Sequence, residues 1–441
     1  MLRAVFANPQ IVATVILLVS YVILFTEKLN RAVVALLGAS VMIFAGILTQ
    51  KTAIEGIDFN TISLLIGMMV IVNITEKSGL FQFVAIWGAK KVKAHPLGIM
   101  VVLTFVTAVF SAFLDNVTTV LLIVPVTFQI TRKLEINPFP YLILEIFASN
   151  IGGTATLIGD PPNILIGSAL KLSFLDFACN LTPAVIIVLL VLIGTFVLIW
   201  HKSLITTERN RVAVLNINEK DSITNPRLLV KSLIVLLMVI IGFIAAEHIG
   251  IANGVIALFG AALLLGLYTA GNNNHERDEN TENMLSLVDW TTIFFFCGLF
   301  VIVHGLEVTG VLQILGQWFI ELTEGSIKKS VFLILGSSAV LSSAIDNIPF
   351  VATMIPMLKT MEPTMGGREA MMPVWWALSL GACFGGNGTL IGASANVIVA
   401  GLAQREGHPL SFLRFLIWSI PVMLFSVFIA GIYLYIRYFA W

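Results

Sequence analysis

The sequence predicts an all-α polytopic membrane protein made of two inverted repeats of about five spans, each with a re-entrant helical hairpin and a broken helix. The first observation is composition: 58% of the 441 residues are hydrophobic, only 11% are charged, and the mean hydropathy is +0.97. Average soluble domains carry about 25% charged residues. The other two observations are an internal repeat and an Asp-Asn pair inside an apolar run of each repeat. Together they indicate a chain embedded in a bilayer.

Uninterrupted spans follow from apolar stretches of about 17–25 residues. They are expected at 10–26, 32–49, 59–76, 182–200, 229–248, 252–269, 290–305 and 414–438. Stretches 97–131 and 330–358 are also apolar, but Asp-Asn interrupts each at its middle, which predicts hairpins. Glycines interrupt 139–170 and 371–400, which predicts broken helices. The polar segments 201–228 and 270–289 are predicted to be loops outside the membrane.

The internal repeat appears as ordered matches at a nearly constant offset. The matches keep an offset of 231 positions through both hairpins, then drift to 233 and 238, as small loop insertions would cause. The matched pairs are Asp58 with Asp289, Gly67 with Gly298, Glu76 with Glu307, Gly79 with Gly310, Asp115-Asn116 with Asp346-Asn347, Pro125 with Pro356, GGTATLIGDPPN at 152–163 with GGNGTLIGASAN at 385–396, and LSFLDF at 172–177 with LSFLRF at 410–415. Repeats of this kind are typical of secondary transporters.

The repeat divides the chain into 1–200 as repeat one, 201–228 as a cytoplasmic linker, and 229–441 as repeat two. A re-entrant hairpin returns to its own side, so each repeat crosses the bilayer an odd number of times and the second copy is inverted. With both termini outside, 17 of the 25 Lys and Arg residues fall on the inside and 8 on the outside. That bias favours this orientation by the positive-inside rule.

Other features exclude several classes of function. The net charge is zero, so composition does not indicate a nucleic-acid partner. Cys179, Cys297 and Cys383 are far apart and form no metal-ligand spacing or disulfide framework, so each is interpreted as a small buried hydrophobe. No nucleophile–base pairing appears in the sequence, so we predict neither an enzyme nor a bound metal or cofactor.

The two Asp-Asn pairs are the first candidate binding residues. A carboxylate at membrane depth costs about 2.5–3.5 kcal/mol on insertion scales, so it is retained where it faces a cavity, a partner or an ion. We therefore predict that Asp115, Asn116, Asp346 and Asn347 form two hairpin tips that enclose a small polar solute. The alternative is that each Asp only caps the half-helix that follows it, and capping and binding can coexist.

The glycine-rich motifs supply a second set of neutral groups. Paired glycines and Pro161-Pro162 would unwind the helices, and no Lys follows that would indicate a nucleotide-binding loop. Candidates to line the breaks are the residues Thr154, Thr156, Asn163, Asn387, Thr389, Ser394 and Asn396. The alternative for the glycines is close helix packing through small residues.

Asp160 breaks the symmetry of the repeat, because its partner position holds Ala393. An unmatched acid near a helix break is a candidate for proton coupling, with Asp115 and Asp346 as the other candidates. The alternative is an N-cap for the second half-helix. Glu145 is a weaker coupling candidate, and His304 beside Glu307 is interpreted as a structural histidine.

SAFLDNVTTVLLIVPVT, NIGGTATLIGDPPN, SSAIDNIPFVATMIP and GACFGGNGTLIGASANV together resemble the P-permease branch of the arsenite-permease (ArsB)/NhaD group in the ion transporter superfamily. The mammalian pink-eyed dilution (P) protein belongs to the same branch. The resemblance runs from about Asp58 to the C-terminus. It implies an elevator-type secondary transporter with a central site, in a homodimer at the inner (plasma) membrane.

Among the functions in that group, arsenite or antimonite export in exchange for protons is our leading hypothesis. Sodium/proton antiport is the first alternative, and a channel is the second. Dicarboxylate transport ranks lower, because dicarboxylate carriers of the superfamily have Ser-Asn-Thr at the tips, whereas an ionised Asp115 or Asp346 would repel an anion and no Arg or Lys lies in either motif. The sequence leaves open whether a soluble ATPase subunit joins the permease.

Overall fold

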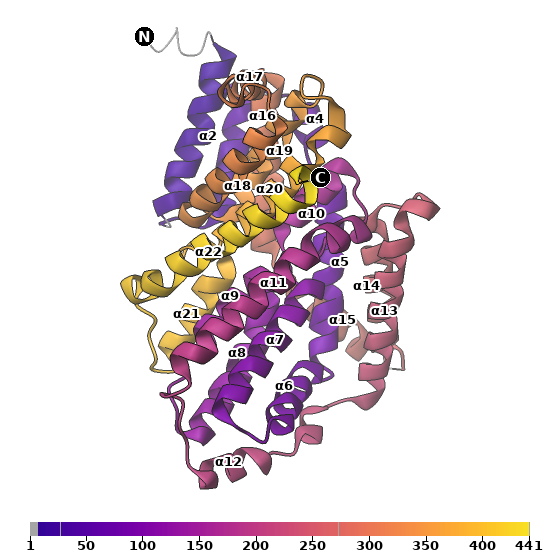
Figure 1. The fold of residues 1–441 in the computed structure, drawn as a ribbon. Helices are drawn as coiled ribbons and strands as arrows, with labels where there is room; N and C mark the ends of the chain where they lie inside the picture. Colours follow the sequence, from indigo (N-terminus) through magenta and orange to yellow (C-terminus); the bar gives the residue numbers. More distant parts are fainter. Residues whose placement is uncertain (1–7, 27, 272, 441) are drawn as a thin grey trace.

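The structure is a computed structural model that describes residues 8–26, 28–271 and 273–440, and every regular element in that part of the chain is helical (Figure 1). Nine helices of the described residues are long and apolar enough to cross a membrane, and the shorter apolar helices α3 and α14 add to these. The predicted all-α polytopic architecture is therefore confirmed. The helices of the first half are α2 (Pro9–Thr26), α3 (Arg31–Phe44), α4 (Gln50–Glu55), α5 (Phe59–Glu76), α6 (Leu80–Lys91), α7 (Pro96–Phe113), α8 (Asn116–Leu134), α9 (Phe139–Gly153), α10 (Pro161–Leu170) and α11 (Phe174–Trp200). The helices that follow are α12 (Glu208–Leu215), η1 (Glu219–Ser222), α13 (Pro226–Ile249), α14 (Asn253–Thr269), α15 (Asn274–Ser286), α16 (Trp290–Val308), α17 (Val311–Thr323), α18 (Ile327–Ala344), α19 (Asn347–Met361), α20 (Gly367–Gly385), α21 (Ser394–Arg405) and α22 (Phe412–Phe439).

Most helix boundaries lie within a few residues of the predicted spans, and the exceptions have local causes. Helix α11 begins at Phe174, eight residues before the predicted 182, because Ser173 and Asp176 form a capping box at its start. The polar segments predicted as loops contain α12 and α15, which side-chain caps from Thr207 and Asn273 begin. The prediction of loops in these two segments is therefore wrong in part, because polar segments between apolar spans can still contain short helices.

Matched glycines begin matched helices. Gly79 precedes α6 with φ +80°, and Gly310 precedes α17 with φ +79°. Residues with a Cβ rarely adopt this left-handed conformation, so glycine is favoured at both turns. At Gly79 a Cβ would also lie 1.7 Å from the carbonyl oxygen of Ser222. The two turns adopt the same conformation 231 positions apart, which supports the predicted repeat.

The two halves of the chain interlock through two long helix pairs. Helix α5 packs along α14, and α16 packs along α3, so each half contributes one helix to each pair. Both crossings use a glycine: a Cβ on Gly67 would lie 2.5 Å from the carbonyl carbon of Ala257, and a Cβ on Gly298 would lie 2.5 Å from that of Ala35. These small residues let the backbones approach closely, as is common in membrane helix pairs.

We expect Gly298→Val to lower the unfolding free energy by about 1–3 kcal/mol, because the added atoms would meet the backbone of α3, which cannot rotate away. The thermal unfolding midpoint of the purified protein in detergent measures this. Gly266→Val is the matched control, since Gly266 lies in α14 with no atom within 4 Å of its Cβ position. Equal midpoints for the two variants would contradict the close crossing.

The remaining helices form a second group around the four interrupted segments. Helix α7 packs along α9, and α18 packs along α20. The short helix after each break then crosses to the other half: α10 packs against α19 and α20, while α21 packs against α8 and α9. Through this exchange the short helix of each half contacts a hairpin helix of the other half.

The linker between the halves is fastened to the first half. Lys90 of α6 donates to the carbonyl of Ile217 at 3.0 Å and lies 2.5 Å from Oε2 of Glu219. The hydrogen bond from Lys90 lowers the pKa of Glu219. The division into residues 1–200, 201–228 and 229–441 stays a prediction, which these packing relations support.

Candidate functional site

The two hairpin tips have the same chain path but different partners for their acids. Asp115 ends the turn before α8, where Oδ1 accepts from the backbone N–H of Thr118 at 2.8 Å and Oδ2 accepts from the Thr118 hydroxyl at 2.5 Å. Asp346 occupies the same place before α19, but its backbone cap from Ile348 is long, at 3.5 Å. Its Oδ2 accepts instead from Ser394 at 3.2 Å and from Arg31 at 3.3 Å. Capping alone therefore accounts for the contacts of Asp115 but not for those of Asp346.

Asp160 lies between the amides of the two tips. Nδ2 of Asn116 donates to its Oδ1 at 3.4 Å, and Nδ2 of Asn347 donates to the same oxygen at 3.3 Å. Asp160 occupies the N-cap position of α10, yet its side chain makes no capping hydrogen bond there. The N-cap alternative is therefore wrong for this residue, which is 1% exposed and joins the two tips.

Asn150, near the end of α9, connects the same cluster to the second break. Its Oδ1 accepts from Asn116 at 3.1 Å, and its Nδ2 donates to Oδ1 of both Asn387 and Asn396 at 2.9 Å. All of these side chains are buried. One amide thus ties a hairpin tip of the first half to the broken helix of the second.

A cavity of about 500 Å³ lies beside the tips, and the end of α5 and the start of α16 also line it. Among the described residues that line it, five are acidic and one is basic. The polar and charged lining residues are Arg31, Asn73, Glu76, Asp115, Asn116, Thr118, Asp160, Asp289, Thr292, Asp346, Asn347 and Ser394. Every predicted tip residue and the predicted coupling acid therefore face one space. An excess of carboxylates gives this space a negative potential that favours neutral or cationic solutes.

Arg31 is a functional candidate that the sequence analysis did not identify. It is the first residue of α3, 315 positions from Asp346 along the chain, and it also donates to Ser394 at 2.7 Å and to Thr292 at 2.6 Å. No base lies within the tip motifs themselves, but a base from another helix reaches Asp346. The available signal was a lone Arg at the start of an apolar span, which the positive-inside rule already explained.

The predicted break residues serve mainly to hold the unwound backbone, and most do not line the cavity. Asn163 donates to the carbonyls of Thr154 and Thr156 at 3.0 and 2.8 Å, and Asn396 donates to those of Gly386 and Thr389 at 2.7 and 2.8 Å. The hydroxyls fix the breaks to the hairpins or to their own helix, with Thr154 donating to Asn150, Thr156 to Ala112 and Thr389 to Ser343. Asn387 is buried, accepts from Asn150 and does not line the cavity. Of the predicted break residues, the structure brings only Ser394 to the cavity wall.

The other acidic candidates fall at different places. Glu145 is 1% exposed and accepts from Thr127 at 2.5 Å, and it does not line the cavity. Glu76 lines the cavity, whereas its match Glu307 lies 3.1 Å from His304 beside a separate cavity of about 300 Å³. In the described part of the chain, no three His, Cys, Asp or Glu side chains are placed to hold a metal ion together.

Comparison with solved structures shows the fold. The crystal structure of the YdaH transporter from Alcanivorax borkumensis aligns with a TM-score of 0.58 over 88% of this chain and 87% of that one. The two sequences are 15% identical, so this likeness shows the fold alone.

Sequence comparison shows the family. An uncharacterised transporter of Mycobacterium tuberculosis is 44% identical over 98% of this chain and 99% of its own length, and one from Synechocystis is 31% identical over 98% and 97%. The P protein of Sus scrofa is 31% identical over 99% of this chain and 60% of its own length, which confirms the expected kinship with the P protein. The sequence model of the family described as "Citrate transporter" (CitMHS) matches residues 21–381. The chain therefore belongs to the citrate transporter family of the ion transporter superfamily and is a multi-pass membrane transporter.

Proposed function

We propose that this chain exports arsenite or antimonite, as the neutral trihydroxide, in exchange for protons. The observation that carries the proposal is the charge of the cavity, which Asp115, Asp160 and Asp346 line together with the tip amides, while only one base is present among the described lining residues. A neutral trihydroxide can donate hydrogen bonds to carboxylates and accept them from Asn116 and Asn347. The assignment to the arsenite-permease/NhaD group is part of this proposal.

Citrate, the solute in the name of the family, would meet the same negative cavity. Free citrate carries up to three carboxylates, and the five acids of the cavity would repel it unless protons or cations offset that charge. Citrate is therefore the comparison solute in the test below.

Sodium/proton antiport is the second candidate. The carboxylate oxygens of Asp115, Asp160 and Asp346 around one cavity are hard ligands, and Na⁺ prefers such oxygen donors. A sodium ion and protons competing for these acids would give exchange without any organic or arsenical solute.

We also propose an elevator mechanism, because opposite ends of the same two helices line the two cavities. The end of α5 and the start of α16, at Glu76 and Asp289, line the 500 Å³ cavity. The start of α5 and the end of α16, at Asp58 and Glu307, line the 300 Å³ cavity. An inverted arrangement of this kind offers the tips two alternative docking positions, one on each side of the membrane.

Transport into everted vesicles tests the proposal. Arsenite accumulation that a protonophore abolishes would support it, and Asp115→Asn and Asp346→Asn are each expected to reduce that accumulation at least about tenfold, since each removes a titrating acid from the cavity. Proton release driven by sodium, with no response to arsenite, would replace it with antiport. Accumulation of citrate but not arsenite would overturn it.

Two further expectations belong to the same proposal. We expect a homodimer, which cross-linking in the membrane measures. Arsenite uptake that requires ATP and survives the protonophore would instead indicate the soluble ATPase subunit, and uptake that never exceeds equilibrium would indicate a channel.

A further inference from the structure

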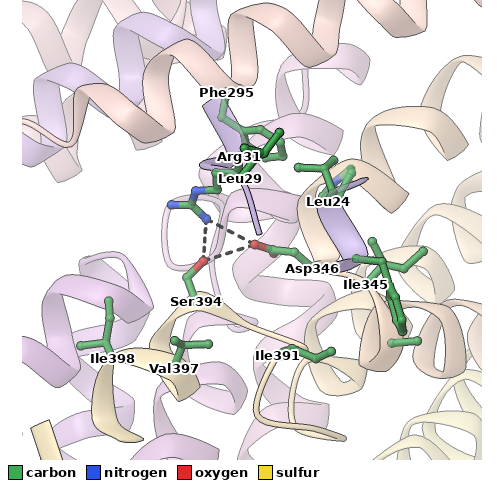
Figure 2. A pocket seen from close by; sticks show the side chains of 13 residues that line it. Leu24, Leu29, Arg31, Phe295, Ile345, Asp346, Ile391, Ser394, Val397 and Ile398 are labelled. Carbon is green, nitrogen blue, oxygen red and sulfur yellow. Dashed lines mark hydrogen bonds and ion pairs between the residues drawn. The ribbon is translucent and has the colours of Figure 1, made fainter. Parts of the chain in front are cut away.

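Arg31 joins three separate parts of the chain at one point. Figure 2 shows its guanidinium above Ser394 and Asp346, with Nη1 donating to Ser394 Oγ at 2.7 Å and to Asp346 Oδ2 at 3.3 Å. Its Nη2 donates to Thr292 Oγ1 at 2.6 Å and lies 3.6 Å from Oδ2 of Asp289. Asp289 and Thr292 begin α16, Asp346 is a hairpin tip, and Ser394 begins the helix after the second break. Arg31 therefore holds the tip and the break against α16.

The same contacts separate two cavities. A second space of about 330 Å³ is lined by Leu24, Phe25, Phe295 and other side chains, most of them apolar. Arg31, Asp346 and Ser394 line both spaces, as does Ile398, which Figure 2 shows below Arg31. Movement of the tip away from Arg31 would join the two spaces.

The contact is present at one tip only. At the other tip, Asp115 is held by Thr118 of its own helix. The counterpart of α3 is α14, which packs along α5 as α3 packs along α16, and α14 begins with the neutral residue Asn253. If a tip docked against α14, the first residue of that helix would therefore not provide a guanidinium to hold it.

The charges around Arg31 allow the contact to be exchanged rather than simply broken. If Asp346 leaves, Arg31 keeps Asp289 and Thr292 as partners, so its charge is not left unpaired in a partly buried place. Asp346 in turn keeps Ser394 and the backbone cap from Ile348. Across the cavity the other charged groups are Glu76, Asp115 and Asp160, all acidic. Among the described residues the ion pairs of Arg31 are with Asp289 and Asp346, and none of these three acids pairs with it.

We propose that Arg31 is a positioning residue of the transport cycle, which holds the second hairpin tip closed while Asp346 is ionised and unoccupied. A proton or a solute hydroxyl on Asp346 takes the place of the guanidinium, and the tip is then free to move. This inference rests on the proposed transport function but not on the identity of the solute. Arg31 thereby prevents the empty, ionised carrier from moving the tip, which keeps proton movement coupled to solute movement.

Substituting Arg31 should therefore create a proton leak. In proteoliposomes without any solute, we expect Arg31→Gln to raise proton flux down a pH gradient about tenfold, the effect of losing ~1.4 kcal/mol from the closed state. Because the leak is measured with protons alone, the result tests the role of Arg31 even if the proposed solute is wrong. Arg31→Lys keeps the charge but cannot contact Ser394, Thr292 and Asp346 together, so an intermediate leak is expected.

Arg132→Gln is the matched control, since Arg132 pairs with Glu406 between α8 and α21, away from the cavity. It should leave the leak at the wild-type level. A folded Arg31→Gln protein with no added leak, or one whose proton and solute fluxes fall in parallel, would overturn the proposal in favour of a structural role. If Arg31→Gln does not fold, Arg31→Lys and Ser394→Ala decide, and wild-type leak in both would overturn it.

Discussion

Asp160→Asn is expected to abolish transport driven by a pH gradient while leaving the protein folded. Asparagine has the same shape, and its Oδ1 can still accept from Asn116 and Asn347, so the link between the two tips is kept. The substitution removes the group that can bind and release a proton. We expect solute accumulation to fall at least about tenfold in everted vesicles, corresponding to ~1.4 kcal/mol or more of lost coupling.

The control for this substitution is Asp278→Asn, which removes an exposed acid of α15 beside Arg277. It should change neither the elution volume of the purified protein nor its transport. Undiminished pH-driven accumulation by a folded Asp160→Asn variant would show that Asp160 only receives hydrogen bonds from the two amides, and coupling would then be assigned to Asp115 or Asp346.

The hairpin tips and Asp160 could be predicted because acidic residues inside apolar runs are recognisable from the local sequence. An acid inside an apolar run is costly, and its recurrence 231 positions later is visible without any knowledge of the fold. Asp160 stood out because the matched position holds Ala393. The cavity lies at these residues, and the structure adds that Asp160 contacts amides of both tips.

The roles of the break residues could not be predicted, because a polar side chain at an unwound helix has two possible uses. Unwinding frees backbone carbonyls that must find donors inside the protein. Asn163 and Asn396 supply those donors at matched positions, each to the threonine carbonyl seven residues before it. The amide groups of Asn163 and Asn396 are used in these hydrogen bonds to the backbone, and neither side chain lines the cavity. Whether such a side chain holds the backbone or lines the cavity depends on the direction in which it points, and the sequence alone does not give that direction.

Arg31 could not be predicted because its partners are distant in the chain, and its presence alters the argument about anionic solutes. A carboxylate solute would have to replace Asp346 at the guanidinium, and Asp346 would then be left beside Asp289 without its cation. Such a solute would bind well only with Asp346 protonated. Under the proposed function, Arg31 would make anion transport conditional on proton uptake, whereas a neutral trihydroxide or a sodium ion would need no such step.

Asn150→Ala should have the largest effect on stability among these substitutions, lowering the free energy of unfolding in mixed detergent by about 3–5 kcal/mol. It would leave the carbonyl oxygens of the Asn387 and Asn396 side chains without their donor in a fully buried place, at about 1–3 kcal/mol for each. The residue lies where a hairpin tip of the first half meets the break of the second, so its loss should also separate the halves. Asn216→Ala, at an exposed helix end, is the control and should change stability by less than about 0.5 kcal/mol. Equal effects of the two substitutions would mean that the hydrogen bonds of Asn150 add nothing to the helix packing that joins the two halves.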